Sequence, residues 1–132
     1  MLRNFTLLNF QPKPGSVIYC DYKGFVAPEM VKKRPVIVVS KHRHNSKLLA
    51  VVPISTTPPT TILDYHLEMD SQFCLIHLSG KKSWVKCDMI NVVSLDRLNL
   101  VRDRRSGSRH APSVGPVFLV KIKEAIRKVH GL

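Results

Sequence analysis

The chain has 132 residues, a length typical of one domain, and it carries 21 lysines and arginines against 9 aspartates and glutamates. The formal charge of +12 and the pI of about 10.1 favour a polyanionic partner, so RNA or DNA is the first ligand to test. Hydrophobic residues make up 44% of the chain, but no apolar run approaches the roughly 20 residues of a membrane span. We therefore expect one soluble domain, residues 1–132, with no membrane partner.

The N-terminal residues lack the small-residue cleavage pattern of a secretory signal, so we expect a cytoplasmic protein whose residues 1–13 form an extended arm. The 3 cysteines, Cys20, Cys74 and Cys87, are odd in number and contain no C-x-x-C pair. This argues against both a disulfide scaffold and a zinc site. Reduced, mostly buried thiols are the expectation.

Short apolar runs separated by Pro, Gly and polar turns predict a small, mostly antiparallel sheet. The run 48–55 is apolar on both faces, as in a central strand, and 63–69 alternates apolar and polar residues with a period of two. A polar turn is expected at 41–47 and a loop of about ten residues at 23–33. The expected strands are, in chain order, 15–22, 34–40, 48–55, 63–69, 84–88 and 89–95, with a further stretch at 73–78 and a turn at 79–82.

Behind Pro116 the apolar residues change to helical spacing, which predicts a terminal helix that stops at Gly131. The basic residues of this helix fit a solvated face better than a dedicated nucleic-acid helix; they are Lys121, Lys123, Arg127 and Lys128. The basic loop 102–110, which contains Arg104 and Arg105, either holds phosphates or only contacts solvent.

Histidine and aromatic side chains leave several interpretations open. His42 and His44 lie in a polar turn without a third ligand nearby, so we expect a solvated turn and neither a metal nor another cofactor. His66 either lines a substrate groove or is an exposed strand residue. Trp84 and Tyr22 are able to stack on unpaired bases. For Trp84, a role in the core or in a dimer fits the sequence at least as well as base stacking.

Taken in order, several motifs resemble the MazF/PemK/Kid-type toxins, the ribonuclease half of bacterial type II toxin-antitoxin pairs. They are Arg34-Pro35 before an aliphatic strand, Val-Pro-Ile-Ser-Thr at 52–56, Val-Lys-Cys-Asp at 85–88, and Val-Ser-Leu-Asp-Arg-Leu at 93–98 before the terminal helix. The resemblance covers residues 14–132. It implies a mainly β fold, a small SH3-like antiparallel β-barrel with a C-terminal α-helix, that assembles as a homodimer. It also implies metal-independent cleavage of single-stranded RNA and neutralisation by a cognate antitoxin with an acidic, disordered tail.

The resemblance assigns catalytic roles to Arg34 and Ser55. When a ribose 2′-OH attacks the adjacent phosphate, negative charge builds on the phosphoryl oxygens, which a guanidinium and a hydroxyl can stabilise. Arg34 also has a possible role in passing a proton to the leaving 5′-oxygen. The alternatives are a surface arginine that caps a loop and a strand-end serine whose hydroxyl is already satisfied.

Three further catalytic assignments follow from the resemblance. Glu29 corresponds to a loop glutamate that orients Arg34 or accepts the 2′-OH proton, although Met30 replaces the glutamine that usually follows. Lys86 and Asp88 correspond to an Arg-x-Asp pair of the Kid-like branch. Lysine keeps the charge but loses the planar fork of arginine. If residues 84–88 form one strand, Lys86 and Asp88 share a face and an ion pair is the alternative role.

RNA contacts are expected from the basic and polar residues around this set, namely Lys32, Lys33, Thr56, His66, Arg104 and Arg105. Two other functions compete with RNA cleavage. Toxins of the same architecture poison DNA gyrase through the end of the helix, but here the helix ends in Lys-Val-His-Gly-Leu without an exposed tryptophan. A non-catalytic nucleic-acid-binding module would bind through charge alone and would cleave nothing at any salt concentration.

Overall fold

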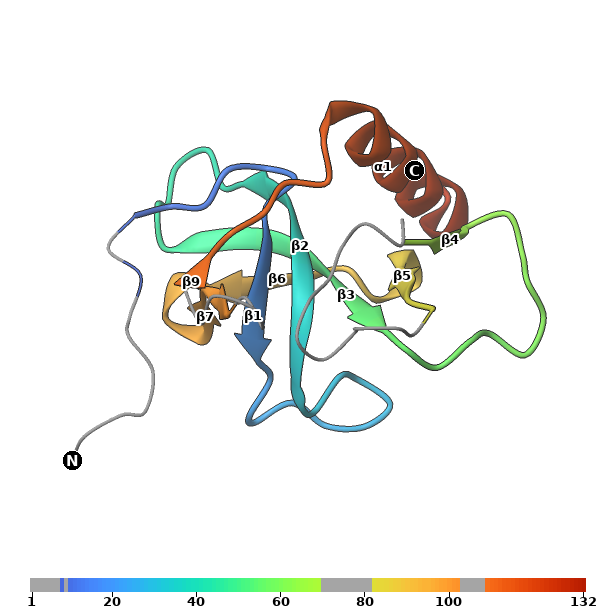
Figure 1. The fold of residues 1–132 in the computed structure, drawn as a ribbon, viewed down its shortest axis with the longest axis horizontal. Helices are drawn as coiled ribbons and strands as arrows, with labels where there is room; N and C mark the ends of the chain where they lie inside the picture. The colour runs from blue at the N-terminus through green and yellow to red at the C-terminus, as the bar shows by residue number, and fades with distance from the viewer. Residues whose placement is uncertain (1–7, 9, 70–81, 103–108) are drawn as a thin grey trace.

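A computed structural model describes residue 8 and residues 10–69, 82–102 and 109–132. Most of the described elements are strands of one curved antiparallel sheet, and α1 closes the chain (Figure 1). The strands are β1 Val17–Asp21, β2 Lys33–Lys41, β3 Leu48–Ser55, β4 His66–Glu68, β5 Trp84–Lys86, β6 Asn91–Ser94, β7 Leu98–Asn99, β8 Val101–Arg102 and β9 Arg109–His110. Two short 3₁₀ helices, η1 Cys87–Met89 and η2 Leu95–Arg97, precede the α-helix α1 Pro116–His130.

The strand order of the sheet is β4-β5-β3-β2-β1-β7, and β6 also pairs with β3. The central position predicted for residues 48–55 is confirmed, because β3 pairs with β2, β5 and β6. The register between β2 and β3 shifts between Val38 and Ser40, an irregularity that increases local twist. The predicted mainly antiparallel fold with a terminal helix is confirmed. The described pairings leave β4 and β7 at the ends of the sheet, so barrel closure stays a prediction.

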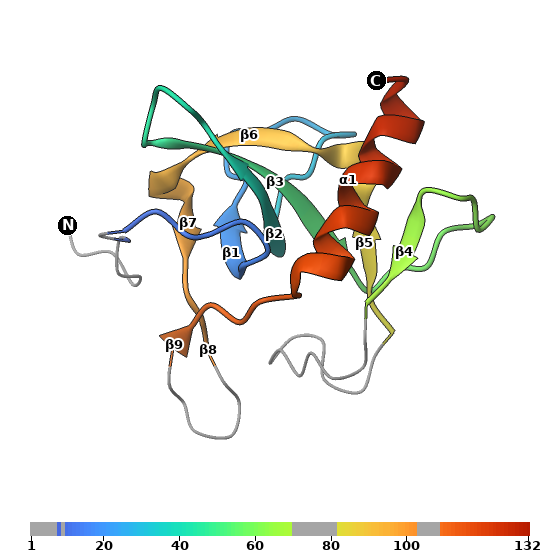
Figure 2. The same cartoon turned by 90° about the horizontal axis from the view of Figure 1, so that it is seen from above.

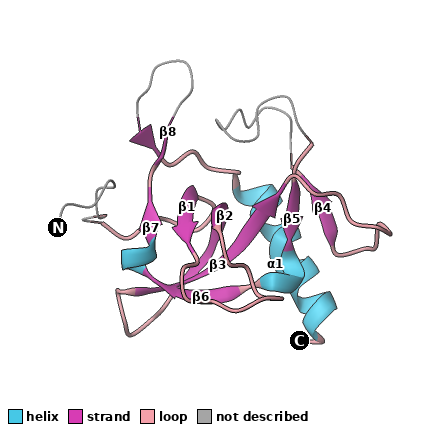
Figure 3. Ribbon diagram, turned by 90° about the horizontal axis from the view of Figure 1, so that it is seen from below, coloured by secondary structure: helices cyan, strands magenta, loops and turns pink. Residues whose placement is uncertain are grey.

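Helix α1 covers one face of the sheet, where it contacts β2, β4 and η1 (Figures 2 and 3). Its buried residues Ile122, Ala125 and Ile126 belong to a cluster that includes Ile54 and Val85 of the sheet. The predicted boundaries are confirmed: Pro116 stands in the first turn, and Gly131 ends the helix in the left-handed conformation with φ +70°. The other face of the sheet carries a second cluster, built around Ile18, Cys20, Tyr22, Val36, Val38, Leu49 and Val51.

The predicted strand 63–69 is too long. Only β4, His66–Glu68, is a strand, and Leu63 is 49% exposed. Residues 63–66 form a turn instead, in which the Leu63 N–H donates to His66 Nδ1 over 2.8 Å and the His66 N–H donates to the Leu63 carbonyl over 3.1 Å. The partner strand β5 also has only 3 residues, and η1 begins directly after Lys86, so the regular β4–β5 pairing starts at His66.

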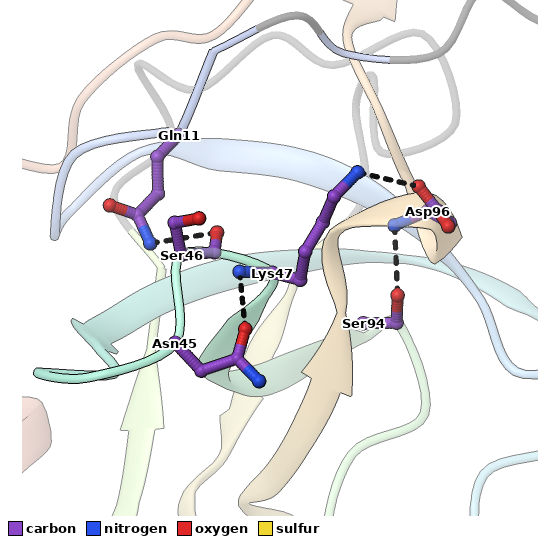
Figure 4. Close-up of polar contacts among 6 residues, drawn as sticks. All are labelled: Gln11, Asn45, Ser46, Lys47, Ser94 and Asp96. Atoms are coloured by element: carbon purple, nitrogen blue, oxygen red, sulfur yellow. Dashed lines mark hydrogen bonds and ion pairs between the residues drawn. The ribbon is translucent and has the colours of Figure 1, made fainter.

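The predicted strand 84–88 ends early as well, because the backbone turns into η1 directly after Lys86. The stretch 73–78 and most of the turn 79–82 lie outside the described residues. In the expected N-terminal arm, the Gln11 side-chain amide donates to the Ser46 carbonyl over 3.1 Å, which ties residue 11 to the turn after β2 (Figure 4). Next to it, Lys47 pairs with Asp96 at 3.7 Å, so this turn also contacts η2 (Figure 4).

Candidate functional site

Strand register places the predicted site residues of four strands on one face of the sheet. Ser55 of β3 lies opposite Trp84 of β5, and Lys86 of β5 lies opposite His66 of β4. Between β2 and β3, Val36 lies opposite Pro53, and the same register continued by two residues sets Arg34 opposite Ser55. Because side chains alternate along a strand, these residues share a face.

That face is the one turned away from α1. Ile54 and Val85, which alternate with the site residues along β3 and β5, pack in the cluster that contains Ile122 of the helix. Arg34 instead lies opposite Cys20 of β1, on the face that carries the second cluster. We call the face that carries Arg34, Ser55, Lys86 and His66 the polar sheet face.

Arg34 is half-buried, and its Nε atom is buried with no hydrogen-bond partner in the described part of the chain. The same holds for Trp84 Nε1, on a side chain that is only 8% exposed. Buried donors of this kind cost about 1–3 kcal/mol each when nothing accepts from them. An acceptor that arrives with a ligand would relieve this cost, which suits an anion.

The sequence predicts a stacking, core or dimer role for Trp84. Its burial favours the core interpretation for the ring, while its unpaired N–H is a donor that the sequence pattern does not reveal. Trp84 and Lys86 are two residues apart on β5, and this spacing places both side chains on one face of the sheet.

Ser55 is buried at the end of β3, with 5% of its surface exposed. Its Oγ accepts a hydrogen bond from the Thr57 N–H over 3.1 Å, which starts the turn after the strand. The hydroxyl therefore has a structural partner on its acceptor side, while its own proton stays available for an acceptor such as a phosphoryl oxygen. Thr56, the next residue, is half-buried.

Lys86 and His66 are both half-buried and face each other across the β4–β5 pair. Because His66 Nδ1 accepts the Leu63 N–H, the neutral ring carries its proton on Nε2. The ring also lies against Tyr65, with 4.3 Å between the ring centroids. His66 thus offers an N–H donor on the strand opposite Lys86, and both groups are able to donate to an anion.

Asp88 does not lie on one strand face with Lys86, and that part of the sequence prediction is wrong. Residues 87–89 form η1, so the period of two that would align the two side chains stops at Lys86. Asp88 is exposed, and none of the ion pairs among the described residues joins it to Lys86.

The loop 22–32 between β1 and β2 contains local hydrogen bonds of its own. The Glu29 carboxylate accepts the Val26 N–H over 2.7 Å, and the Glu29 N–H donates to the Val26 carbonyl over 2.9 Å. Glu29 is exposed, as are Lys32 and Lys33 at the entry to β2. No described contact joins Glu29 to Arg34. Arg104 and Arg105 lie outside the described residues.

The thiols of Cys20 and Cys87 are free and buried, as predicted, while Cys74 lies outside the described residues. Burial raises the pKa of Cys20 and of Cys87 to about 12. His42 Nδ1 accepts the N–H groups of His44 and Asn45, so this imidazole shapes its turn. Within the described ranges no group of three or more His, Cys, Asp or Glu residues is arranged to hold a metal, and no helix has the length and hydropathy to cross a membrane.

Residues 13–130 match the family described as the PemK-like, MazF-like toxin of type II toxin-antitoxin systems. An uncharacterized protein of Haemophilus influenzae is 31% identical, with 89% of each chain covered. The Escherichia coli K12 protein YifN, also uncharacterized, is 31% identical, with 74% of this chain and 78% of its own covered.

Solved structures show the same fold. MazF of Deinococcus radiodurans superposes with a TM-score of 0.64 at 16% identity, covering 94% of this chain and 100% of its own. A mycobacterial endoribonuclease, solved in complex with its cognate antitoxin, superposes with a TM-score of 0.62 at 23% identity, covering 92% and 96%. With a family match over almost its whole length and a MazF-like fold, the chain belongs to the PemK-like, MazF-like toxins of type II toxin-antitoxin systems.

Proposed function

We propose that this protein is an endoribonuclease toxin that cuts single-stranded RNA at short sequence motifs and thereby stops translation and growth. The observation that carries the proposal is the strand register, which brings Arg34, Ser55, Lys86 and His66 from four strands to one sheet face. The charge of +12 and the family membership support it.

In the proposed reaction a carboxylate takes the proton of the ribose 2′-OH, and the 2′-oxygen attacks the adjacent phosphorus. The bond from phosphorus to the 5′-oxygen breaks, which leaves a 2′,3′-cyclic phosphate and a 5′-OH. Asp88 and Glu29 are the proposed proton acceptors. The departing 5′-oxygen takes up a proton from Arg34 or from solvent.

Arg34 and Ser55 would stabilise the charge that develops on the phosphoryl oxygens, because both present donors on the polar sheet face. Lys86 and the Nε2–H of His66 would hold a neighbouring phosphate. We propose RNA contacts also for Lys32, Lys33 and Thr56, and for Arg104 and Arg105.

The proposed partners follow from the same surface. An antitoxin with an acidic, disordered tail would compete with RNA for this basic face, and the toxin would act as a homodimer on cytoplasmic mRNA. The mycobacterial neighbour solved with its cognate antitoxin supports the antitoxin part of this proposal.

The decisive experiment incubates the purified full-length protein, freed of antitoxin, with a long single-stranded RNA in EDTA, and maps and chemically types the cut ends. We expect discrete cuts with 2′,3′-cyclic phosphate and 5′-OH ends. Arg34→Ala should lower the cleavage rate by about 10²–10³-fold while the protein stays folded, because Arg34 acts on transition-state charge.

Intact RNA with the folded wild-type protein would overturn the proposal and favour the gyrase-directed or purely binding alternatives. The only tryptophan of the chain is the buried Trp84 of β5 and not a residue of the helix end. Full activity of Arg34→Ala would remove Arg34 from the mechanism and leave the ribonuclease assignment in place.

A further inference from the structure

Arg97 lies outside the proposed catalytic set, but it holds the start of the loop 22–32, which precedes Arg34 in the chain. From η2 its Nη1 donates to the Asp21 carbonyl over 3.0 Å and to the Lys23 carbonyl over 2.7 Å, across 76 and 74 residues of sequence. Both carbonyls belong to the segment where β1 ends and the loop 22–32 begins. Two charge-assisted bonds therefore hold this corner of the backbone.

The guanidinium also packs against the first side chains of the loop. It lies over the Phe25 ring with 4.9 Å between Cζ and the ring centroid, and Phe25 meets the fully buried Tyr22 edge-on at 5.3 Å. Between them Gly24 has a φ of +95°, a conformation that favours glycine, and Arg97 Nη2 stands 4.0 Å from the place a Cβ would occupy. Arg97, Phe25 and Tyr22 form what we call the loop anchor.

The loop anchor acts at the point where both ends of the loop meet. Asp21, whose carbonyl accepts from Arg97, is the register partner of Lys33, so the loop leaves and rejoins the sheet at this pair. The next pair along the strands is Cys20 and Arg34. Arg97 thus holds the backbone at the pair of Asp21 and Lys33, which is next to the pair that contains Arg34.

The loop then returns over the same side of the sheet as the site. Phe25 and Met30 pack against the cluster that contains Cys20 and Val36, and Val36, two residues after Arg34 on β2, lies on the same face as Arg34. Glu29, directly before Met30, and Lys32, two residues after it, are exposed. The placement of these two groups relative to Arg34 depends on how the loop is held at its base.

We propose that Arg97 is a positioning residue, which holds the loop 22–32 so that its basic residues and Glu29 stand beside Arg34 for RNA binding. The catalytic half of this inference rests on the proposed function, whereas the ordering of the loop does not. Contacts of Lys32 and Lys33 with RNA phosphates would form before the chemical step, so loosening the loop should raise KM more than it lowers kcat.

The first test measures loop order without RNA. Glu29 is the only glutamate between residues 1 and 67, so cleavage after it by a glutamate-specific protease releases the fragment 1–29, which mass spectrometry identifies. In Arg97→Gln we expect this cleavage to be about tenfold faster, because two charge-assisted bonds are lost. Arg97→Lys, which keeps the charge but not the fork, should lie between this variant and the wild type.

The matched control is Arg43→Gln, which makes the same charge change in the exposed turn at the other end of β2 and should leave the cleavage rate unchanged. If Arg97→Gln does not fold, Phe25→Leu weakens the loop anchor while the two hydrogen bonds stay, and should speed cleavage by a smaller factor. Cleavage at the wild-type rate in every folded variant of the loop anchor would overturn the inference.

The second test measures RNA cleavage by the same variants. We expect Arg97→Gln to raise KM about tenfold and to lower kcat by less than about threefold, with partial recovery in Arg97→Lys. A loosened loop with unchanged KM and kcat would overturn the positioning role. If the wild-type protein cuts no RNA, the proposed function fails, and the protease result still decides whether Arg97 orders the loop.

Discussion

At the scale of single residues, the proposed site presents two buried donors. Arg34 Nε and Trp84 Nε1 are buried donors for which the described residues offer no acceptor, and Ser55 stands between them in the register. Buried donors gain free energy when an acceptor reaches them. In the proposed function, a phosphate oxygen of RNA is that acceptor.

Lys86 is the residue that the resemblance pairs with an arginine of the Kid-like branch. We expect Lys86→Ala to weaken RNA binding at about 100 mM salt and to reduce the slope of log affinity against log salt by about one, because one phosphate contact is lost. Lys86→Arg should keep the slope, since the charge is retained. The measurement is a fluorescence-anisotropy titration over a salt series.

Lys41 is the matched control for this prediction, because it is an exposed cation at the opposite end of β2 from Arg34. Lys41→Ala should change the slope by less than Lys86→Ala does. Equal slopes in the wild type and Lys86→Ala would return Lys86 to a role as a surface lysine.

At the scale of elements, strand lengths depend on partners as much as on sequence pattern. The alternation over 63–69 is regular, yet β4 is only as long as the three residues of β5 that pair with it. The apolar run 48–55 agrees with its predicted bounds, because β3 has partners on both sides. Pattern thus indicates which face of a segment is buried, and pairing decides where the strand ends.

The packing of α1 gives a prediction at this scale. Ile122 is fully buried between α1 and the sheet, so Ile122→Ala should lower the free energy of unfolding by about 2–4 kcal/mol through lost burial and a residual cavity. Val117, on the same helix, is 72% exposed, and Val117→Ala should change this free energy by less than about 0.5 kcal/mol. Urea unfolding followed by circular dichroism measures both, and equal effects would contradict the packing described for α1.

At the scale of the whole molecule, buried thiols couple stability to pH. The folded protein raises the pKa of Cys20 and of Cys87 to about 12, whereas an unfolded thiol has a pKa of about 8.5. Between these values the unfolded chain binds fewer protons than the folded one, so the free energy of unfolding falls as pH rises. Their full contribution is present below about pH 8.5 and is lost toward pH 12.

From pH 8 to pH 10 the two thiols together should lower the free energy of unfolding by about 3–4 kcal/mol. Urea unfolding at a series of pH values measures this slope. The double variant Cys20→Ala, Cys87→Ala should show a flatter profile over the same interval. A double variant with the wild-type slope would assign the effect to other groups.

The sequence by itself determined β1, β2, β3, the terminal helix and the strong positive charge, because these depend on local pattern, on proline and glycine signals and on composition. Family motifs named Arg34 and Ser55. Only the tertiary structure decided which residues meet: β2, β3, β4 and β5 bring residues 34, 55, 66 and 86 to one face, and η1 separates Asp88 from Lys86. It alone brought Arg97 to the base of the loop 22–32, since strand register and contacts across more than 70 residues are set by packing between segments.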